Sequence, residues 1–158
     1  MVRKTDGEGK IIYDINDIAA WFINKEPMSD KKLQKLSYYA VAWGWALFNR
    51  PIVHNDRFEA WVHGPVSPQL YQEYREHGWN KIAAPVKEAH AFDEEMTNLL
   101  ESVWATYGDK SGNELEALTH TEAPWQAARI GLHPDDACHN VISPQTMRQF
   151  YLSIYSGD

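Results

Sequence analysis

The part of the chain that most strongly specifies its own backbone is FEAWVHGPVSP, residues 58–68. In its first half, Phe58, Ala60 and Val62 alternate with other residues at the period of a strand that has one buried face. Just upstream, residues 52–53 are apolar and residues 55–56 are Asn-Asp, a pair typical of tight turns. We therefore expect residues 52–53 and 58–62 to pair as a small antiparallel β-hairpin.

The second half of this stretch redirects the backbone. Gly64-Pro65 is typical of a turn and predicts that the strand ends there. Ser67 then offers a side chain that can cap a helix, and Pro68 fits the first helical position. We expect a helix that begins at Pro68 and ends near His77-Gly78.

The remainder of the chain predicts helices that begin at capping or proline signals. Their expected starts are Asp14, Ser29 or Asp30, Asp93, Ser111, Pro124 and Ser143-Pro144, and the last helix should turn Met147, Phe150, Tyr151 and Ile154 inward.

The longest of these helices ends at Asn49, and its aromatic residues on several sides predict that it is buried centrally. Gly44 inside it predicts a close crossing with another helix. The predicted fold is mainly α: a single globular helical domain with a small antiparallel β-hairpin, over residues 14–158, preceded by a flexible N-terminal arm of residues 1–13.

Composition limits the classes of function. With 158 residues, 44% of them hydrophobic, the chain has the size of one domain. Its formal charge of −7 argues against a broad electrostatic contact with nucleic acid or with an anionic membrane. A single cysteine, Cys138, excludes an intrachain disulfide and a multi-thiolate metal site. We find no signal sequence or membrane-spanning stretch, and we expect a cytoplasmic protein.

Seven histidines make metal binding a possible function of the chain. The densest group of candidate ligands is His133, Asp135-Asp136, Cys138 and His139, but its spacing fits no helical or finger-type site. Surface roles explain these residues more simply. We assign no metal and no cofactor.

Two further patterns bear on catalysis. Ser67 follows His63 by four residues, but its position before Pro68 suits a helix cap better than an activated nucleophile. His120-Thr121-Glu122 is similar to the H-x-E half of a zinc deaminase motif, yet the paired cysteines of that motif are absent. We therefore predict that the protein is not an enzyme.

DNA binding remains an alternative. Residues 14–36 can be drawn as a helix-turn-helix in which Lys31, Lys32 and Lys35 face phosphates. The second helix is too aromatic for reading a groove, and its lysines are more simply a solvated face. Nucleic acid is therefore not the expected partner.

Three blocks together resemble a known family, the SocA-like, phage-associated antitoxins with a Panacea domain. They are the stretch around Trp61, His63, Gly64 and Pro65; Lys32-Leu33-Gln34-Lys35-Leu36 with Tyr38-Tyr39-Ala40; and Leu118-Thr119-His120 with Pro124-Trp125 and Ala128-Arg129. The blocks occur in the family's order, and a similar last helix extends the likeness from about Asp14 to Tyr155.

The resemblance implies an antitoxin that neutralises a cognate toxin by direct contact, with the toxin encoded nearby, often in a prophage. A protease is the alternative partner, since at least one family member is an adaptor that delivers its toxin for degradation. The residues that carry the likeness, interpreted as scaffold or as a partner-binding patch, are Trp61, His63, Gly64, Pro65, His120, Trp125 and Arg129. Trp79, expected in a loop, is a further candidate anchor.

Overall fold

A computed structural model describes residues 5–78, 80–83 and 91–155. In chain order the elements are α1 (Ile15–Lys25), α2 (Asp30–Phe48), β1 (Glu59–Trp61), β2 (Gly64–Val66), α3 (Pro68–Tyr74), a 3-10 turn (Arg75–His77), α4 (Glu94–Tyr107), α5 (Gly112–His120), α6 (Ala123–Ala128) and α7 (Pro144–Ile154). Within the described ranges the protein is a mostly helical single domain with one two-stranded antiparallel sheet, which confirms the predicted fold class.

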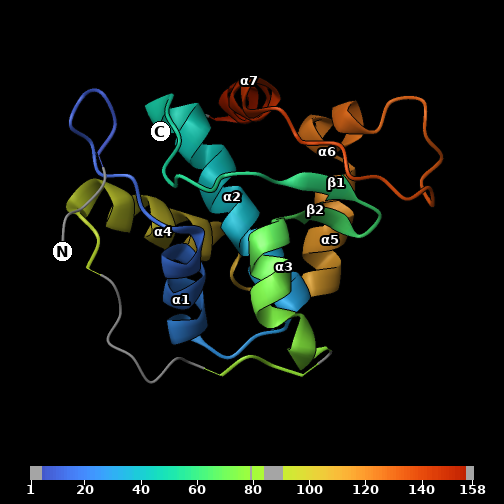
Figure 1. Ribbon diagram of the computed structural model, residues 1–158, viewed down its shortest axis with the longest axis horizontal. Coiled ribbons are helices and arrows are strands. Elements are labelled where there is room, and N and C mark those ends of the chain that lie inside the picture. The colour runs from blue at the N-terminus through green and yellow to red at the C-terminus, as the bar shows by residue number, and fades with distance from the viewer. Residues whose placement is uncertain (1–4, 79, 84–90, 156–158) are drawn as a thin grey trace.

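Helix α2 lies at the centre of the molecule, with the other helices arranged around it (Figure 1). It contacts α1, α3, α4, α5, α7 and strand β2. Twelve of its nineteen residues are buried, including Tyr38 and Tyr39. The aromatic helix predicted to be central is therefore central.

Side-chain caps begin most of the helices. A backbone N–H is bound at the start of a helix by the side chains of Asp14, Ser29, Ser67, Asp93, Ser111 and Ser143. Ser111 and Glu114 form the reciprocal capping box. Helix α6 differs slightly from expectation, because it begins at Ala123, one residue before Pro124, and Glu122 gives it no side-chain cap.

The hairpin exists, but the predicted strand partner was wrong. Strand β1 pairs with β2, and Trp61 lies opposite Gly64 across a turn at Val62 and His63. Gly64-Pro65 therefore opens the second strand instead of ending the first. Val53, the expected partner, forms a parallel bridge with Tyr13. Alternation predicts that a strand exists but not which neighbour it pairs with, and proline is tolerated in β2 because a two-stranded sheet has only edges.

Two packing predictions also need correction. A side chain at Gly44 would meet Ile52 Cγ2 at 2.7 Å, so the close approach there comes from the segment after α2 and not from another helix. In α7, Met147 and Tyr151 are buried as expected, but Ile154 is 52% exposed because the helix reaches past the core.

The predicted arm is partly packed. Tyr13, its last residue, is only 4% exposed, and its backbone N–H donates to the Ile52 carbonyl at 2.9 Å. Residues 1–4 of the arm, the candidate anchor Trp79 and residues 84–90 lie outside the described residues, and the arm's flexibility stays a prediction. No helix in the described part of the chain is both long and apolar enough to cross a membrane.

Candidate functional site

The hairpin is tied to α6 through its backbone. Trp125 Nε1 donates to the Trp61 carbonyl at 2.8 Å, and Arg129 Nη1 donates to the Ala60 carbonyl at 2.8 Å. The His120 ring stacks on Trp125 with centroids 4.0 Å apart. Burial lowers the pKa of His120. These contacts join α5, α6 and β1 into one unit.

Arg129 also holds the loop that follows α6. Its Nη2 atom donates to the carbonyl oxygens of His133, Pro134 and Asp136 at 3.2, 3.2 and 2.6 Å. Its guanidinium lies 4.9 Å from the centroid of the Trp125 ring. With 5% of the residue exposed, all of these donors act inside the protein.

Glu59 organises the outer side of the hairpin. Its carboxylate accepts hydrogen bonds from Arg57 Nε at 2.7 Å and Trp61 Nε1 at 2.9 Å, and lies 3.3 Å from His139 Nδ1. Burial opposes ionisation of Glu59, but the hydrogen bonds from Trp61, Arg57 and His139 hold its pKa below the usual value. Trp61 is therefore held by hydrogen bonds at both its backbone carbonyl and its indole nitrogen.

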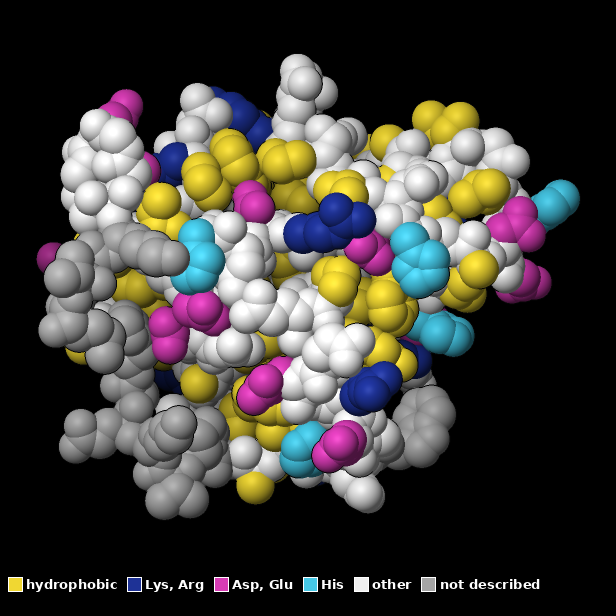
Figure 2. Space-filling model, in the orientation of Figure 1, with side chains coloured by type: hydrophobic (Ala, Val, Ile, Leu, Met, Phe, Trp, Pro, Cys, Tyr) yellow, Lys and Arg dark blue, Asp and Glu magenta, His cyan; other side chains and the backbone are white. Residues whose placement is uncertain are grey.

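Beside these residues lies a cavity of about 650 Å³, here called the hairpin cavity. Its walls come from the start of α2, the hairpin, α3 and the start of α5, which lie close together at the centre and centre right of Figure 1. Trp61 and His63 line it, together with residues such as Asp30, Lys31, Lys35, Tyr71 and Arg75. Figure 2 shows histidine side chains next to hydrophobic ones over this part of the molecule.

Lys35 lies in the wall of this cavity, which corrects its predicted place on a solvated face. The residue is 1% exposed, and burial lowers the pKa of its ammonium to about 8. Gly64 explains how it fits: a Cβ there would lie 2.7 Å from Lys35 Cε, and the backbone φ of +106° also favours glycine.

Glu116 contacts two side chains at the rim of the cavity. It lies 2.8 Å from Lys31 Nζ and 3.4 Å from His63 Nδ1. Burial raises the pKa of Glu116, but the contacts with Lys31 and His63 outweigh it and keep the pKa below the usual value. The His63 side chain is otherwise 73% exposed, so the tip of the hairpin faces solvent.

Asp30 stands at the first position of α2. Its Oδ1 atom is enclosed and has no hydrogen-bond partner among the described residues. Burial raises the pKa of this carboxyl, while Lys35 and His77 act in the opposite direction.

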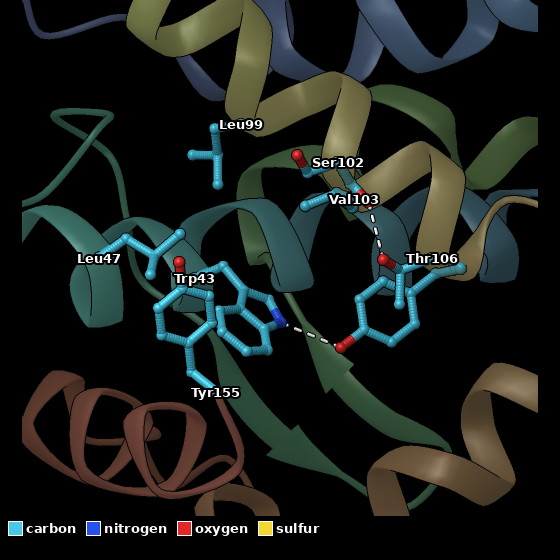
Figure 3. A pocket seen from close by; sticks show the side chains of 8 residues that line it. Trp43, Leu47, Leu99, Ser102, Val103, Thr106 and Tyr155 are labelled. Atoms are coloured by element: carbon cyan, nitrogen blue, oxygen red, sulfur yellow. Dashed lines mark hydrogen bonds between the residues drawn. The ribbon is translucent and has the colours of Figure 1, made fainter. Parts of the chain in front are cut away.

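A second cavity, of about 290 Å³, lies between α2 and α4 (Figure 3). Trp43, Leu47, Leu99 and Tyr155 give it a mainly apolar lining. Trp43 Nε1 donates to Tyr107 Oη at 2.9 Å across one side. The polar group of Trp43 is thus satisfied within the protein.

The candidate metal ligands do not converge. Cys138 is buried and His139 binds Glu59, whereas His133 is exposed in the loop after α6. Among the described residues, no three His, Cys, Asp or Glu side chains are placed to hold a metal ion. Ser67 caps α3 and receives a hydrogen bond from Gln34, consistent with the cap interpretation.

The helix-turn-helix alternative loses its basic face. Lys31 pairs with Glu116, Lys32 pairs with Glu26 at 3.2 Å, and Lys35 is buried. On the face shown in Figure 2, acidic and basic side chains are interspersed.

The structure brings Trp61, His63, Gly64 and Pro65 together in the hairpin, and places His120, Trp125 and Arg129 behind it. Sequence reasoning missed Lys35, Glu59 and Glu116 as members of this site. For Lys35 a signal existed, because positions three, four and seven residues later are Tyr38, Tyr39 and Ala42, which mark a buried helix face. For Glu59 and Glu116 we find no comparable signal.

Comparisons with known proteins follow this geometry. Residues 33–126 match the family described as antitoxin SocA-like, Panacea domain. That range includes the hairpin and Trp125 but stops three residues short of Arg129. The chain is 32% identical over 122 residues to Antitoxin SocA of Caulobacter vibrioides (strain NA1000 / CB15N). This match covers 66% of the chain and 62% of that protein, so the chain spans less than two thirds of the relative's length. No solved structure matched the chain.

Proposed function

Because this chain belongs to the family of SocA-like antitoxins with a Panacea domain, we propose that it is the antitoxin of a toxin–antitoxin pair and neutralises its cognate toxin by direct binding. The match over residues 33–126 is the observation that carries this proposal. The toxin is encoded nearby, and neutralisation takes place in the cytoplasm without catalysis by this protein.

The exposed tip of the hairpin supports direct contact. His63 is largely exposed beside Trp61 and the hairpin cavity, while the backbone under it is held by Trp125 and Arg129. A rigid, exposed turn beside an aromatic ring loses little conformational freedom when a partner binds it. We place the toxin contact at this tip and regard Trp125 and Arg129 as its scaffold.

The first experiment expresses the adjacent open reading frame from an inducible promoter, with and without this protein. Growth arrest alone and rescue on co-expression are the expected results. Co-purification of the two proteins in a stable complex would support masking, whereas a fall in toxin abundance would support delivery to a protease. A neighbour that is harmless, or toxic and not rescued, would overturn the pairing.

A matched pair of variants tests the contact. His63→Ala should abolish rescue and leave the melting temperature unchanged, because the side chain is mostly in solvent. His133→Ala, at another exposed histidine, should rescue as well as the wild type. Equal rescue by both variants would remove the hairpin tip from the interface.

A further inference from the structure

Two helix starts meet at the hairpin cavity. Residues 29–31 at the start of α2 and residues 111–113 at the start of α5 both line it. In each helix a serine side chain binds the N–H of the third helical residue, Lys32 or Glu114. Among the described residues, the first backbone N–H groups of both helices have no hydrogen-bond acceptor, and the positive ends of both helix dipoles lie at the cavity wall. The cavity wall therefore favours a negatively charged ligand.

Lys35 adds an enclosed cation to the same wall. None of the described residues makes a hydrogen bond or an ion pair with its Nζ atom, although the residue is only 1% exposed. Glu116 and Asp30 act on it only by electrostatic attraction without direct contact. A buried ammonium without a partner is costly and is normally retained where something pairs with it. A ligand that fills the cavity could supply that partner.

The nearby charges do not supply it. Glu116 and Asp30 both attract the Lys35 charge electrostatically, but Glu116 contacts Lys31 and His63, and neither carboxylate forms an ion pair with Lys35 among the described residues. At the rim, Arg75 adds a further cation that has no ion pair among the described residues. The cavity thus carries surplus positive charge in a chain whose overall charge is −7.

The size and the remaining lining indicate more than a bare ion. A volume of about 650 Å³ lies in the range of small-molecule sites. Trp61 and Tyr71 contribute aromatic surface, with their ring centroids 5.0 Å apart, and Val66 contributes aliphatic surface. The ligand that fits is an anionic group carried on an apolar or aromatic body.

We propose that the hairpin cavity is a binding site for an oxyanion, a phosphate or carboxylate group, and that Lys35 Nζ is its central donor. The group belongs to a small molecule or to an acidic side chain of the partner. Recognition by this cavity goes beyond the toxin pairing, and it can be measured on this protein alone.

The test is calorimetric titration of the purified chain with pyrophosphate and with succinate, at constant ionic strength. We expect saturable binding of at least one of them at a single site. Lys35→Met, which keeps the length of the side chain and removes its charge, should weaken binding about ten- to hundredfold. Lys81→Met, at an exposed lysine outside the cavity, should bind as the wild type does.

A second measurement keeps the proposal falsifiable if Lys35→Met fails to fold. In nitrogen-15 spectra of the wild type, either anion that binds should shift the indole N–H of Trp61 and leave that of Trp43, which lines the other cavity, in place. No saturable binding of either anion, unchanged affinity in a folded Lys35→Met protein, or shifts at Trp43 alone would overturn the proposal.

Competition then identifies the source of the anion. If the anion that binds displaces a purified toxin from the complex, an acidic side chain of the toxin occupies the cavity. If the complex forms equally well with the anion present, the site serves a free small molecule. Failure of the toxin pairing would leave the titration untouched, so the two proposals fail separately.

Discussion

Lys35 is a charged side chain in the middle of a buried helix face, between Gln34 and Leu36, which are also buried. Its ammonium forms no ion pair within the described structure, so the folded state carries the cost of desolvating it. Gly64 leaves room for this side chain, because a Cβ at that position would lie 2.7 Å from Lys35 Cε. Lys35 therefore lowers the stability of the fold, whereas Gly64 suits the positive φ of its position.

We expect Lys35→Met to raise the free energy of unfolding at pH 7 by roughly 3 kcal/mol, the equivalent of a pKa lowered from 10.5 to about 8. Between pH 8 and 10.5 the unfolded state binds the Lys35 proton and the folded state does not, so wild-type stability gains on the variant as pH rises through that window. Urea denaturation of both proteins from pH 7 to 10 measures the gap.

Lys81→Met is the control for this prediction, because an exposed lysine contributes little to stability. The prediction of a buried, unpaired ammonium would be contradicted by equal free energies of unfolding for the wild type and Lys35→Met at pH 7. A difference between these free energies that stays constant up to pH 10 would also contradict it.

At the scale of secondary-structure elements, Arg129 joins strand β1 to the loop after α6 through four backbone carbonyls. We expect Arg129→Ala to lower the free energy of unfolding by about 3 kcal/mol or more, since buried acceptors lose their donors. Arg129→Lys should recover little of this, because an ammonium cannot copy the planar fork of the guanidinium. Thermal and urea denaturation measure both variants. An Arg129→Ala protein as stable as the wild type would remove the scaffold role.

Glu122 connects three helices. At the start of α6, its carboxylate accepts from Tyr39 Oη of α2 at 2.8 Å and from Tyr151 Oη of α7 at 2.9 Å. Tyr38 Oη lies 3.1 Å from Tyr151 Oη and extends the network. Burial raises the pKa of Glu122, although both tyrosine hydroxyls favour its ionised form.

Substitution of Glu122 separates hydrogen bonding from charge. Glu122→Ala should destabilise by about 3 kcal/mol, because two buried hydroxyls lose their acceptor. Glu122→Gln keeps an acceptor oxygen and should cost much less. Because the folded pKa is raised, wild-type stability should fall relative to Glu122→Gln as pH rises above the unfolded value of 4.5. Urea denaturation between pH 4 and 7 tests the trend. Wild-type stability that rises relative to Glu122→Gln with rising pH would show that the tyrosine hydroxyls lower the pKa of Glu122 instead.

At the scale of the whole molecule, α2 touches α1, α3, α4, α5, α7 and the hairpin. The buried apolar residues of the described chain form one cluster, so we expect unfolding in one cooperative step. Far-ultraviolet circular dichroism and tryptophan fluorescence should give coincident urea transitions. Separate midpoints would show that the hairpin and α6 form a unit less stable than the helices on the other side of α2.

The same scales explain what the sequence could predict. Helix starts were predictable because a cap such as Ser111 with Glu114 is a local pattern. The hairpin was predictable as an element, but its partner strand depended on a turn at Val62 and His63 that has no strong signal. The site was only partly predictable, since Trp61 and Trp125 are sixty-four residues apart and meet only in three dimensions. The charge of Lys35 predicts a solvated side chain, whereas its place on an aromatic helix face predicts a buried one, and the second prediction is the correct one.

The rate at which the Cys138 thiol is labelled can report local opening of this protein. The residue is 7% exposed and follows the loop whose carbonyls Arg129 binds, and its Sγ atom accepts a hydrogen bond from the Asn140 N–H at 3.4 Å. A shielded thiol reacts with an alkylating reagent only when the structure around it opens, so the labelling rate reports how often that loop leaves the strand. Since it is the single cysteine of the chain, the wild-type protein can be labelled without engineering. A slower labelling rate with the toxin bound would show that the toxin covers or stabilises this loop.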